Sequence, residues 1–435
     1  MKCVCTHFRR RPPLPPPPLL LLLLLLLTPS APSLQMRLWH QAWLPLWGRP
    51  ELLERSDAFF FEQLANASSF AAFEGYAGAH WPKETAAVAN GSAVSVPWAG
   101  LAHAAWPFGG EANGTVLVWE SAQIDNALVL WQQPHVIFMA ELQRRAANAS
   151  GGGAAALAAM QRLAPLVFAS ADYLASRAYF NESDGAGGRW WLGPPIMGGQ
   201  EGGDAFRTFN PLFELVYMAY TLDLASEWRA VLGLAPSPSY EAVAGNIAAL
   251  PLDPAWPASP ANTPLYSLDV GCVCYDLPGG AGNALCDKKW LPAGGSTCGS
   301  VSSHPLLVGA FGLVNGLARG GRYGVDRSTA NASVAEIIRL WPQWTSAWGW
   351  DDGLLAMSLT RLGWAPEASV AILLDDKFPY YKSGQTLCCP TYLPGNGGLL
   401  LAIAMIGGGT DTSPPCAFPA SWGAVCEGFD VPFPS

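Results

Sequence analysis

The sequence predicts a single large domain built mainly from α-helices. Apolar residues recur at helical spacing over several long segments, strand patterns are scarce, and half of the 435 residues are hydrophobic. Segments rich in Gly, Pro and Trp separate the helical ones, notably 76–135, 183–209, 250–304 and 376–398. Successive units of helix, long loop and helix fit a toroid of helical hairpins, whose loops would form the binding cleft.

Residues 1–33 are predicted to be a secretory signal and leader. Arg9-Arg10-Arg11 precede a proline run and nine consecutive leucines, Leu19 to Leu27, and small residues follow. A basic head, a short apolar middle and a small-residue tail are typical of a secretory signal. The leucine run is far shorter than the ~20 residues of a membrane-spanning helix, and we find no later uninterrupted apolar stretch of that length. Because the proline-rich leader is atypical, a wrongly assigned gene start is the alternative.

Sequons and cysteines also indicate secretion, or passage into an endomembrane lumen. Six Asn-x-Ser/Thr sequons predict glycosylated surface loops, at Asn66, Asn90, Asn113, Asn148, Asn181 and Asn331. Eight cysteines follow the leader, and in an oxidising compartment they are expected to form disulfides within loops. They are Cys272, Cys274, Cys286, Cys298, Cys388, Cys389, Cys416 and Cys426. Zinc binding is the alternative, although no paired C-x-x-C pattern is present.

The charge balance argues against nucleic acid as a partner. Four of the 24 basic residues and none of the 33 acidic ones lie in residues 1–33, so the remainder carries a net charge of −13. Phosphate binding needs clustered Lys and Arg, which an acidic chain does not offer. The 19 tryptophans instead suit a site that stacks flat ligands such as sugar rings.

Helical periodicity is clearest in residues 157–174 and, more loosely, in residues 212–231. Asp326-Arg327-Ser328 is expected to open another helix, and Gly353 to Leu362 to form one more. Val116 and Val118 beside Asn113-Gly114 predict a short hairpin.

The segment from Trp190 to Gly203 carries the clearest chemical signal. Glu201 lies in a glycine-rich stretch just after the pair Trp190-Trp191 and ahead of a predicted helix start near Asn210. Glycines allow the backbone to approach a ligand, and aromatic faces provide flat apolar platforms. A carboxyl desolvated in such a place holds a proton near neutral pH, as a general acid requires. A solvated loop carboxylate is the plainer alternative.

Six sequence blocks, taken in order, resemble the catalytic domain of six-hairpin glycosidases, specifically the maltose, trehalose and kojibiose phosphorylase family and its hydrolytic relatives. The resemblance covers roughly residues 37 to 430. The blocks are Gly75-Tyr76-Ala77-Gly78-Ala79-His80-Trp81-Pro82-Lys83-Glu84, Trp131-Gln132-Gln133-Pro134-His135 with Glu141-Leu142, the Glu201 segment with Asn210 and Glu214, Ser302-Ser303-His304-Pro305, Trp348-Gly349-Trp350-Asp351-Asp352, and Tyr392 to Leu400. The resemblance implies an (α/α)6 toroid with an inverting reaction at its mouth.

The resemblance also implies roles for individual residues. Glu201 matches the family's general acid, with Gln200 where Asp is usual, and Asn210 looks like the asparagine that helps line the sugar subsite. The remaining residues expected to contact substrate, or the phosphate or water that attacks it, are Trp81, Lys83, His135, Ser303, His304, Trp350, Tyr392, Asn396 and Gly397. The alternatives are a core or capping role for His135 and His304, core packing for Trp350, helix packing for Gly397 and an exposed charge for Lys83.

An inverting hydrolase also needs a second carboxylate, about 6.5–9.5 Å from the acid, to activate water. Asp352 and Asp351 are the candidates, because a Trp-Gly-Trp turn leads them into a predicted helix; ordinary helix capping is their alternative. A phosphorylase needs no such base, and Gly395-Asn396-Gly397-Gly398 ahead of an apolar helix would then hold phosphate through backbone N–H groups.

The sequence therefore predicts a secreted glycoside hydrolase that acts on a carbohydrate, with an α-linkage and inversion implied by the resemblance. No spacing implies a metal or another cofactor. An inverting disaccharide phosphorylase and a non-catalytic carbohydrate-binding homologue are the alternatives. The family's N-terminal β-sandwich and first hairpin have no counterpart here, so a toroid incomplete at its N-terminus is also open.

Overall fold

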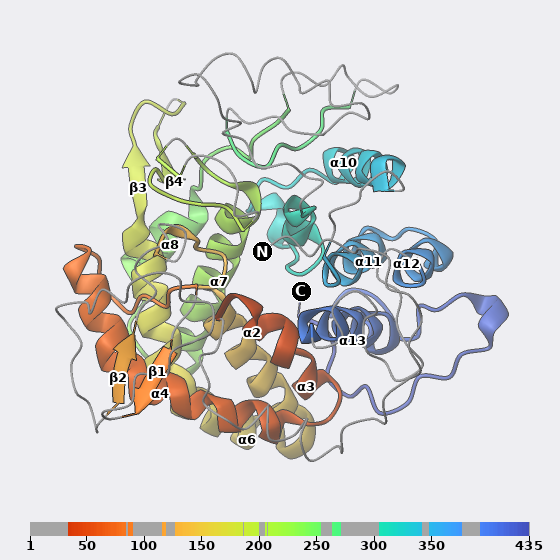
Figure 1. Cartoon of the computed structure of the whole chain (residues 1–435), viewed down its shortest axis with the longest axis horizontal. Coiled ribbons are helices and arrows are strands. Elements are labelled where there is room, and N and C mark those ends of the chain that lie inside the picture. The colour runs from red at the N-terminus through yellow and green to blue at the C-terminus, as the bar shows by residue number, and fades with distance from the viewer. Residues whose placement is uncertain are drawn as a thin grey trace, which may run out of the picture.

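The computed structural model describes residues 34–83, 86–89, 115–118, 127–185, 187–199, 205–206, 208–253, 263–270, 304–341, 348–375 and 392–434. These residues are mostly helical, which confirms the prediction of an all-α protein. The helices form the body of the molecule, and the short strands lie on one side of it (Figure 1). The leader, residues 1–33, lies outside the described residues.

The bounds of the helices follow the chain as α2 Leu34–Gln41, α3 Trp43–Leu46, α4 Pro50–Phe73, α6 His135–Arg177, α7 Leu212–Val231, α8 Pro238–Gly245, α10 Arg327–Leu340, α11 Asp351–Leu362, α12 Pro366–Leu373 and α13 Leu393–Gly408. Three short 3-10 helices join them: η1 Leu306–Phe311, η2 Arg319–Gly321 and η4 Ala420–Trp422.

All four helices predicted from the sequence are present. Residues 157–174 lie within α6, and α7 has the bounds of the predicted segment 212–231. α10 begins at Arg327, where the Asp326 side chain caps it by accepting the N–H of Thr329. α11 begins two residues before Gly353 because Asp351 and Asp352 form its first turn.

Two antiparallel pairs of strands accompany the helices. β2 Thr115–Val118 contains the predicted Val116 and Val118, but it pairs with β1 Ala86–Ala89, so its partner lies far upstream of Asn113-Gly114. β3 Ala178–Asn181 pairs with β4 Arg189–Leu192, which the sequence analysis treated as loop. The two loop tryptophans, Trp190 and Trp191, therefore belong to a strand.

α6 is long and apolar enough to cross a membrane by length and composition alone. This is weak support for a membrane span, because a buried core helix passes the same test. Gly152, at φ 68° and ψ −167°, interrupts the helical backbone and divides α6 into two parts. Within the part of α6 before Gly152, the stretch from His135 to Gln143 is buried on all sides, as expected of a core helix.

Six segments contact one another in a closed circuit. α2 packs on α6, α6 on α7, α7 on η1, η1 on α11, α11 on α13, and α13 packs back on α2. α7 is buried on every side from Leu212 to Ala225, and α11 from Asp351 to Leu359. α4, α8, α10 and α12 pack against these segments with one face each. Figure 1 shows α2 and α13, which come from opposite ends of the described chain, side by side.

Glycines permit the close contacts of this circuit. A Cβ on Gly397 of α13 would lie 1.5 Å from the Trp39 carbonyl oxygen of α2. A Cβ on Gly353 of α11 would lie 2.3 Å from the carbonyl oxygen of Gly398 in α13. Any larger residue at Gly397 or Gly353 would collide with backbone, so these two glycines let neighbouring helices approach closely.

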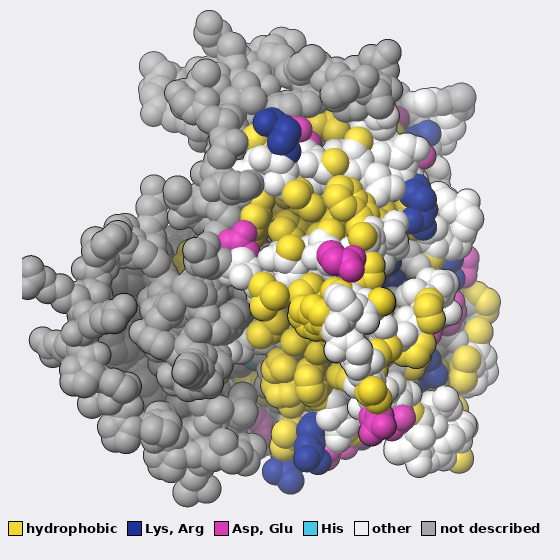
Figure 2. Space-filling model, turned by 90° about the vertical axis from the view of Figure 1, so that its right-hand side faces the viewer, with side chains coloured by type: hydrophobic (Ala, Val, Ile, Leu, Met, Phe, Trp, Pro, Cys, Tyr) yellow, Lys and Arg dark blue, Asp and Glu magenta, His cyan; other side chains and the backbone are white. Residues whose placement is uncertain are grey.

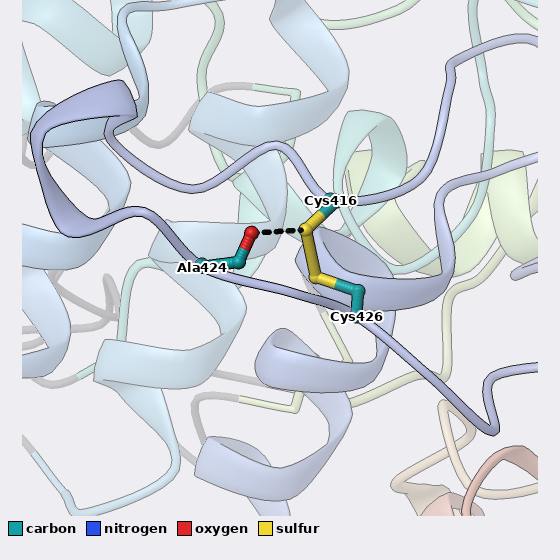
Figure 3. The surroundings of a disulfide bond; sticks show 3 residues. All are labelled: Cys416, Ala424 and Cys426. Atoms are coloured by element: carbon teal, nitrogen blue, oxygen red, sulfur yellow. Dashed lines mark hydrogen bonds between the residues drawn. A yellow bond between two sulfur atoms is a disulfide. The ribbon is translucent and has the colours of Figure 1, made fainter.

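One disulfide joins Cys416 and Cys426 in the segment after α13, with a Cα–Cα distance of 5.5 Å (Figure 3). It closes a short surface loop that includes η4, and the Ala424 carbonyl oxygen lies 3.5 Å from Cys416 Sγ. This pair agrees with disulfides as loop staples, whereas the other six cysteines beyond the leader lie outside the described residues.

Four sequons lie in regular structure and not in loops as expected: Asn66 in α4, Asn148 in α6, Asn181 in β3 and Asn331 in α10. Asn148 is exposed, but Asn331 is half-buried and its side chain bonds both Trp364 and the Arg327 carbonyl. Asn148 is thus the more accessible of these two acceptors. On the face shown in Figure 2, hydrophobic side chains gather between sparse charged ones, as the low charged content leads one to expect.

Candidate functional site

A cluster of three buried tryptophans lies where the segments of the circuit meet. Trp39 comes from α2, Trp131 from the turn before α6, and Trp350 from the residue that precedes α11. The Trp39 and Trp350 rings stack with centroids 5.1 Å apart, and Trp131 lies 6.4 and 5.7 Å from them. Trp131 also contacts Phe213 of α7 at 6.3 Å. We call Trp39, Trp131 and Trp350 the tryptophan cluster.

His304 and Asp351 form an ion pair beside this cluster. The His304 ring stacks on Trp350 at 4.5 Å, and its Nδ1 lies 3.0 Å from Asp351 Oδ1. The other carboxylate oxygen accepts the backbone N–H of Trp348 at 2.6 Å. Burial raises the pKa of Asp351 above its ordinary value, although the facing histidine opposes the shift.

Tyr392 extends this aromatic group at the start of α13. Its ring lies 5.4 Å from that of Trp348, and Trp348 in turn lies 6.1 Å from His304. Asp352, next to Asp351 in the first turn of α11, is also buried. The structure thus brings five predicted site residues together at one place: Asp351, Asp352, His304, Trp350 and Tyr392.

Glu214 is a third buried carboxyl in this region, and the sequence analysis gave it no role. It lies in the first turn of α7, next to Phe213, and its Oε1 accepts the backbone N–H of Gly199 at 2.7 Å. Burial raises the pKa of Glu214 to about 7, which the bond from Gly199 partly opposes. One signal was available: Glu214 is the only charged residue in the apolar run from Leu212 to Tyr220.

Gly199 connects Glu214 to the tryptophan cluster. A Cβ on Gly199 would lie 3.0 Å from the Trp131 ring and 2.4 Å from a Leu306 methyl group of η1. The chain at Gly199 is therefore packed between α7, η1 and the Trp131 ring. Gln200 and Glu201 follow it directly in the sequence and lie outside the described residues, as does Ser303.

Asn210 lies in a strained backbone conformation at the entrance to α7. Its φ of 48° is uncommon for a residue other than glycine, although asparagine tolerates it best. Its side-chain oxygen accepts the N–H of Leu192, and its own N–H donates to the Leu192 carbonyl. Among the described residues, its buried side-chain nitrogen has no hydrogen-bond partner.

His135 opens α6 directly below the cluster. Its ring contacts Trp131 edge-on at 5.0 Å, and its Nδ1 lies 3.1 Å from the Tyr217 hydroxyl. Burial lowers the pKa of His135 to about 3, so the ring is neutral at any physiological pH. His135 can therefore position a neighbour but cannot supply a proton as an imidazolium.

Trp81 and Lys83 are not part of the tryptophan cluster, and Trp81 contacts the residues that follow Trp131. Trp81 packs on Phe60 at 4.9 Å, and its indole N–H donates to Ser170 in the core between α4 and α6. Its backbone is bound by the side chains of Gln132 and Gln133, the residues that follow Trp131. Trp81 thus supports the turn that carries Trp131 and lies in the core of the protein. Lys83 is also buried, and its carbonyl accepts the N–H of Gln35.

The predicted anion site at the start of the last helix needs a correction. α13 begins at Leu393, so Gly397 and Gly398 lie inside the helix and not ahead of it. Backbone N–H groups from the fifth helical residue onward bond within the helix and cannot cradle an anion. Gly397 serves instead as the contact with α2, whereas Asn396 is half-buried one residue earlier.

The described residues thus offer buried carboxyls, a neutral histidine and indole rings around one centre. Protonated and ionised carboxyls at one site can share acid and base work, and indole faces pack against sugar rings. Within the described segments, no group of three or more His, Cys, Asp and Glu could hold a metal ion.

A scan of the chain against protein-family models gave no match, and a search of curated protein sequences found no significant relative.

Proposed function

We propose that the chain is a secreted O-glycosidase whose site lies at the tryptophan cluster. The observation that carries this proposal is the burial of three carboxyls at the first turns of α7 and α11: Asp351 and Asp352 directly follow Trp350, and Glu214 bonds Gly199, which packs on Trp131. Two carboxyl groups in unlike surroundings are what glycoside hydrolysis requires.

The proposed architecture is an (α/α)6 toroid. The circuit α2, α6, α7, η1, α11 and α13 supplies six inner segments, and α4, α8, α10 and α12 pack outside them. In such a toroid the cleft forms at the end where the inner helices begin. The start of α6, α7, α11 and α13 beside the site residues supports this arrangement. The closed circuit favours a complete ring over one open at the N-terminal side.

In the proposed reaction, Glu201 protonates the departing oxygen of the glycosidic bond. Only two peptide units, about 7 Å when extended, separate Glu201 from Gly199, which packs on Trp131. A carboxyl delivered to this apolar surrounding would keep its proton near neutral pH. Gln200 and Asn210 are proposed to bind the sugar ring.

Of the two base candidates, Asp352 is preferred. Both oxygens of Asp351 already bind protein groups, His304 and the N–H of Trp348, which gives Asp351 a structural role in the turn before α11. Asp352 would activate water on the face of the sugar opposite Glu201. Inversion then requires the two carboxyl groups to lie about 6.5–9.5 Å apart.

The test is a panel of α- and β-linked disaccharides and glycosides, incubated with the purified protein with and without phosphate. We expect phosphate-independent release of sugar, with the product of inverted configuration seen by NMR before mutarotation. Turnover only with phosphate would favour a phosphorylase, and protection by a ligand without turnover would favour a binding protein.

Two variants test the residue roles. Glu201→Gln and Asp352→Asn should each reduce kcat by at least about 100-fold while thermal unfolding stays within a few degrees of wild type. Glu182→Gln, an exposed carboxyl in the turn after β3, is the matched control and should keep full activity. Full glycosidase activity in Glu201→Gln would remove Glu201 from the mechanism.

A further inference from the structure

We propose that Glu214 is a positioning residue of the site, which holds the main chain at Gly199 in place against α7. The inference rests on the proposed function, because it concerns the chain that runs on from Gly199 to Glu201. It concerns a described contact, however, and can be tested without any substrate.

The contact joins the chain before residue 200 directly to the first turn of α7. Glu214 Oε1 accepts the Gly199 N–H at 2.7 Å, and Gly199 itself is too crowded to carry a side chain because Leu306 and Trp131 lie against it. The chain just before Gly199 is held by Met197, whose N–H donates to the Leu128 carbonyl at 2.9 Å. Glu214 is therefore the side-chain anchor of the last described residue in this stretch, Gly199.

The carboxyl has unusual surroundings for an anchor. Glu214 is 3% exposed and forms no ion pair with any described residue, so no cation of the described segments compensates a negative charge there. An amide or hydroxyl group would accept the same N–H at lower electrostatic cost. A carboxyl at this position adds one property that they lack, namely a charge that depends on pH.

The charged and titratable groups around Glu214 leave it isolated. The chain from Gly193 to Gly199 and the whole of η1 contain no titratable side chain. On α6, His135 is neutral, and it faces Tyr217 of α7. On α8, Tyr240 bonds Asp172 of α6, and Glu241 lies 3.9 Å from Arg322. His304 and Asp351 bind each other beyond Trp350.

Two consequences follow for the site. While Glu214 is neutral, the Gly199 backbone is held by the bond to its carboxyl and by the packing of Trp131 and Leu306. Ionisation places an unpaired charge in an apolar surrounding, which is relieved when the packing at Gly199 opens and water enters. Loss of the anchor should therefore reduce kcat, through misplacement of the acid, more than it raises KM.

The experiment measures hydrogen exchange at the Gly199 amide from pH 5 to pH 9, corrected for the intrinsic pH dependence, in the full chain. Wild type should lose protection progressively as pH rises from 5 through 7 and level off above that. Glu214→Gln, which keeps an acceptor oxygen but no charge, should keep protection constant over this range. Glu214→Leu should lose at least tenfold in protection at every pH, and Glu227→Gln, an exposed carboxyl on the same helix, should match wild type.

Activity on the best substrate of the panel gives the second readout. Glu214→Leu should reduce kcat at least tenfold with KM within about threefold, and Glu214→Gln should restore most of kcat and move the alkaline limb of the pH profile upward. Unchanged Gly199 protection in Glu214→Leu, or an unaltered alkaline limb in Glu214→Gln, overturns the proposal.

The two hypotheses fail differently. If wild type hydrolyses no glycoside but the exchange results hold, the proposed function is wrong and Glu214 still anchors Gly199. If Glu214→Leu does not fold, the comparison of wild type with Glu214→Gln across pH decides, because both keep the acceptor oxygen.

Discussion

His304 and Asp351 lie 3.0 Å apart, Nδ1 to Oδ1, at the junction between the chain leading into η1 and the first turn of α11. The histidine ring also covers Trp350, so one pair fixes both the start of a central helix and one face of the tryptophan cluster. Because Asp351 is fully buried, the pair is expected to matter for stability as well as for the geometry of the site.

Replacement of Asp351 with Ala should lower the free energy of unfolding by about 3 kcal/mol. The variant leaves His304 and the N–H of Trp348 without their acceptor in a buried place. Asp351→Asn keeps an acceptor oxygen and should lose about 1 kcal/mol. Denaturant unfolding measures both values. Glu367→Gln, an exposed acid in the first turn of α12, is the control, and equal stability of Asp351→Ala and this control would contradict a structural role.

Replacement of Gly397 with Ala should destabilise the protein severely. The added methyl group would lie 1.5 Å from the Trp39 carbonyl oxygen, so α13 must move away from α2. We expect a loss of at least about 3 kcal/mol and a cooperative drop in thermal midpoint. Gly153→Ala in α6 is the matched control, since nothing lies within 4 Å of its Cβ and alanine favours the helix. A wild-type midpoint in Gly397→Ala would exclude the tight contact of α13 with α2.

Glu214 should make stability depend on pH in a defined window. Its pKa is about 7 in the folded chain against an ordinary value of 4.5, so folding favours the protonated form. The stability from this group is fully present below about pH 4.5 and is lost as pH rises through 7, by roughly 3 kcal/mol at most. Glu214→Gln should remove this slope, which denaturant unfolding at pH 5, 6, 7 and 8 would detect. The same slope in wild type and variant would show that another group titrates there.

Loss of the Cys416–Cys426 disulfide should loosen the loop around η4 while the helical body stays folded. The bond closes a loop with a sequence separation of 10, for which chain entropy predicts about 2–3 kcal/mol. The double change of both cysteines to Ser should raise hydrogen exchange in residues 414–430 and leave α7 protected. Equal exchange rates in this segment with and without the bond would indicate that its backbone hydrogen bonds alone hold it.

Helices could be predicted where apolar residues recur at helical spacing, or where the capping residue lies within a few positions of the helix start. Asp326 caps α10 through a bond to a residue three positions away, and Leu212 to Val231 is apolar enough to read directly. The strand β4 could not be predicted, since Trp190 and Trp191 pair with residues of β3 across a turn rich in polar residues. That pairing depends on tertiary contacts, and a strand of only four residues is too short to show an alternating hydrophobic pattern.

The site could be predicted in outline because its residues sit beside aromatic and glycine signals in the sequence. Asp351, His304 and Trp350, each singled out in the sequence, lie together because the start of α11 and the turn before it carry two of them and the third packs on that turn. Glu214 escaped notice because its significance comes from burial and from Gly199, 15 residues away, which no local pattern encodes. Gly397 was predicted to contact a ligand. Its actual constraint is the Trp39 carbonyl oxygen, which leaves no room for a side chain. That residue is 358 positions away in the sequence, so no local pattern could reveal it.

The seam between α2 and α13 makes assembly of the molecule wait for its last helix. The Trp47 indole N–H donates to the Leu400 carbonyl across 353 residues, and the Trp47 ring meets Phe429 at 5.2 Å. A nascent chain cannot make these contacts until nearly all of it has left the ribosome, so α2 and α3 complete their packing only at the end of synthesis, although α2 also contacts α6. Such late closure predicts slow, chaperone-assisted maturation and a protein that unfolds first by parting at this seam.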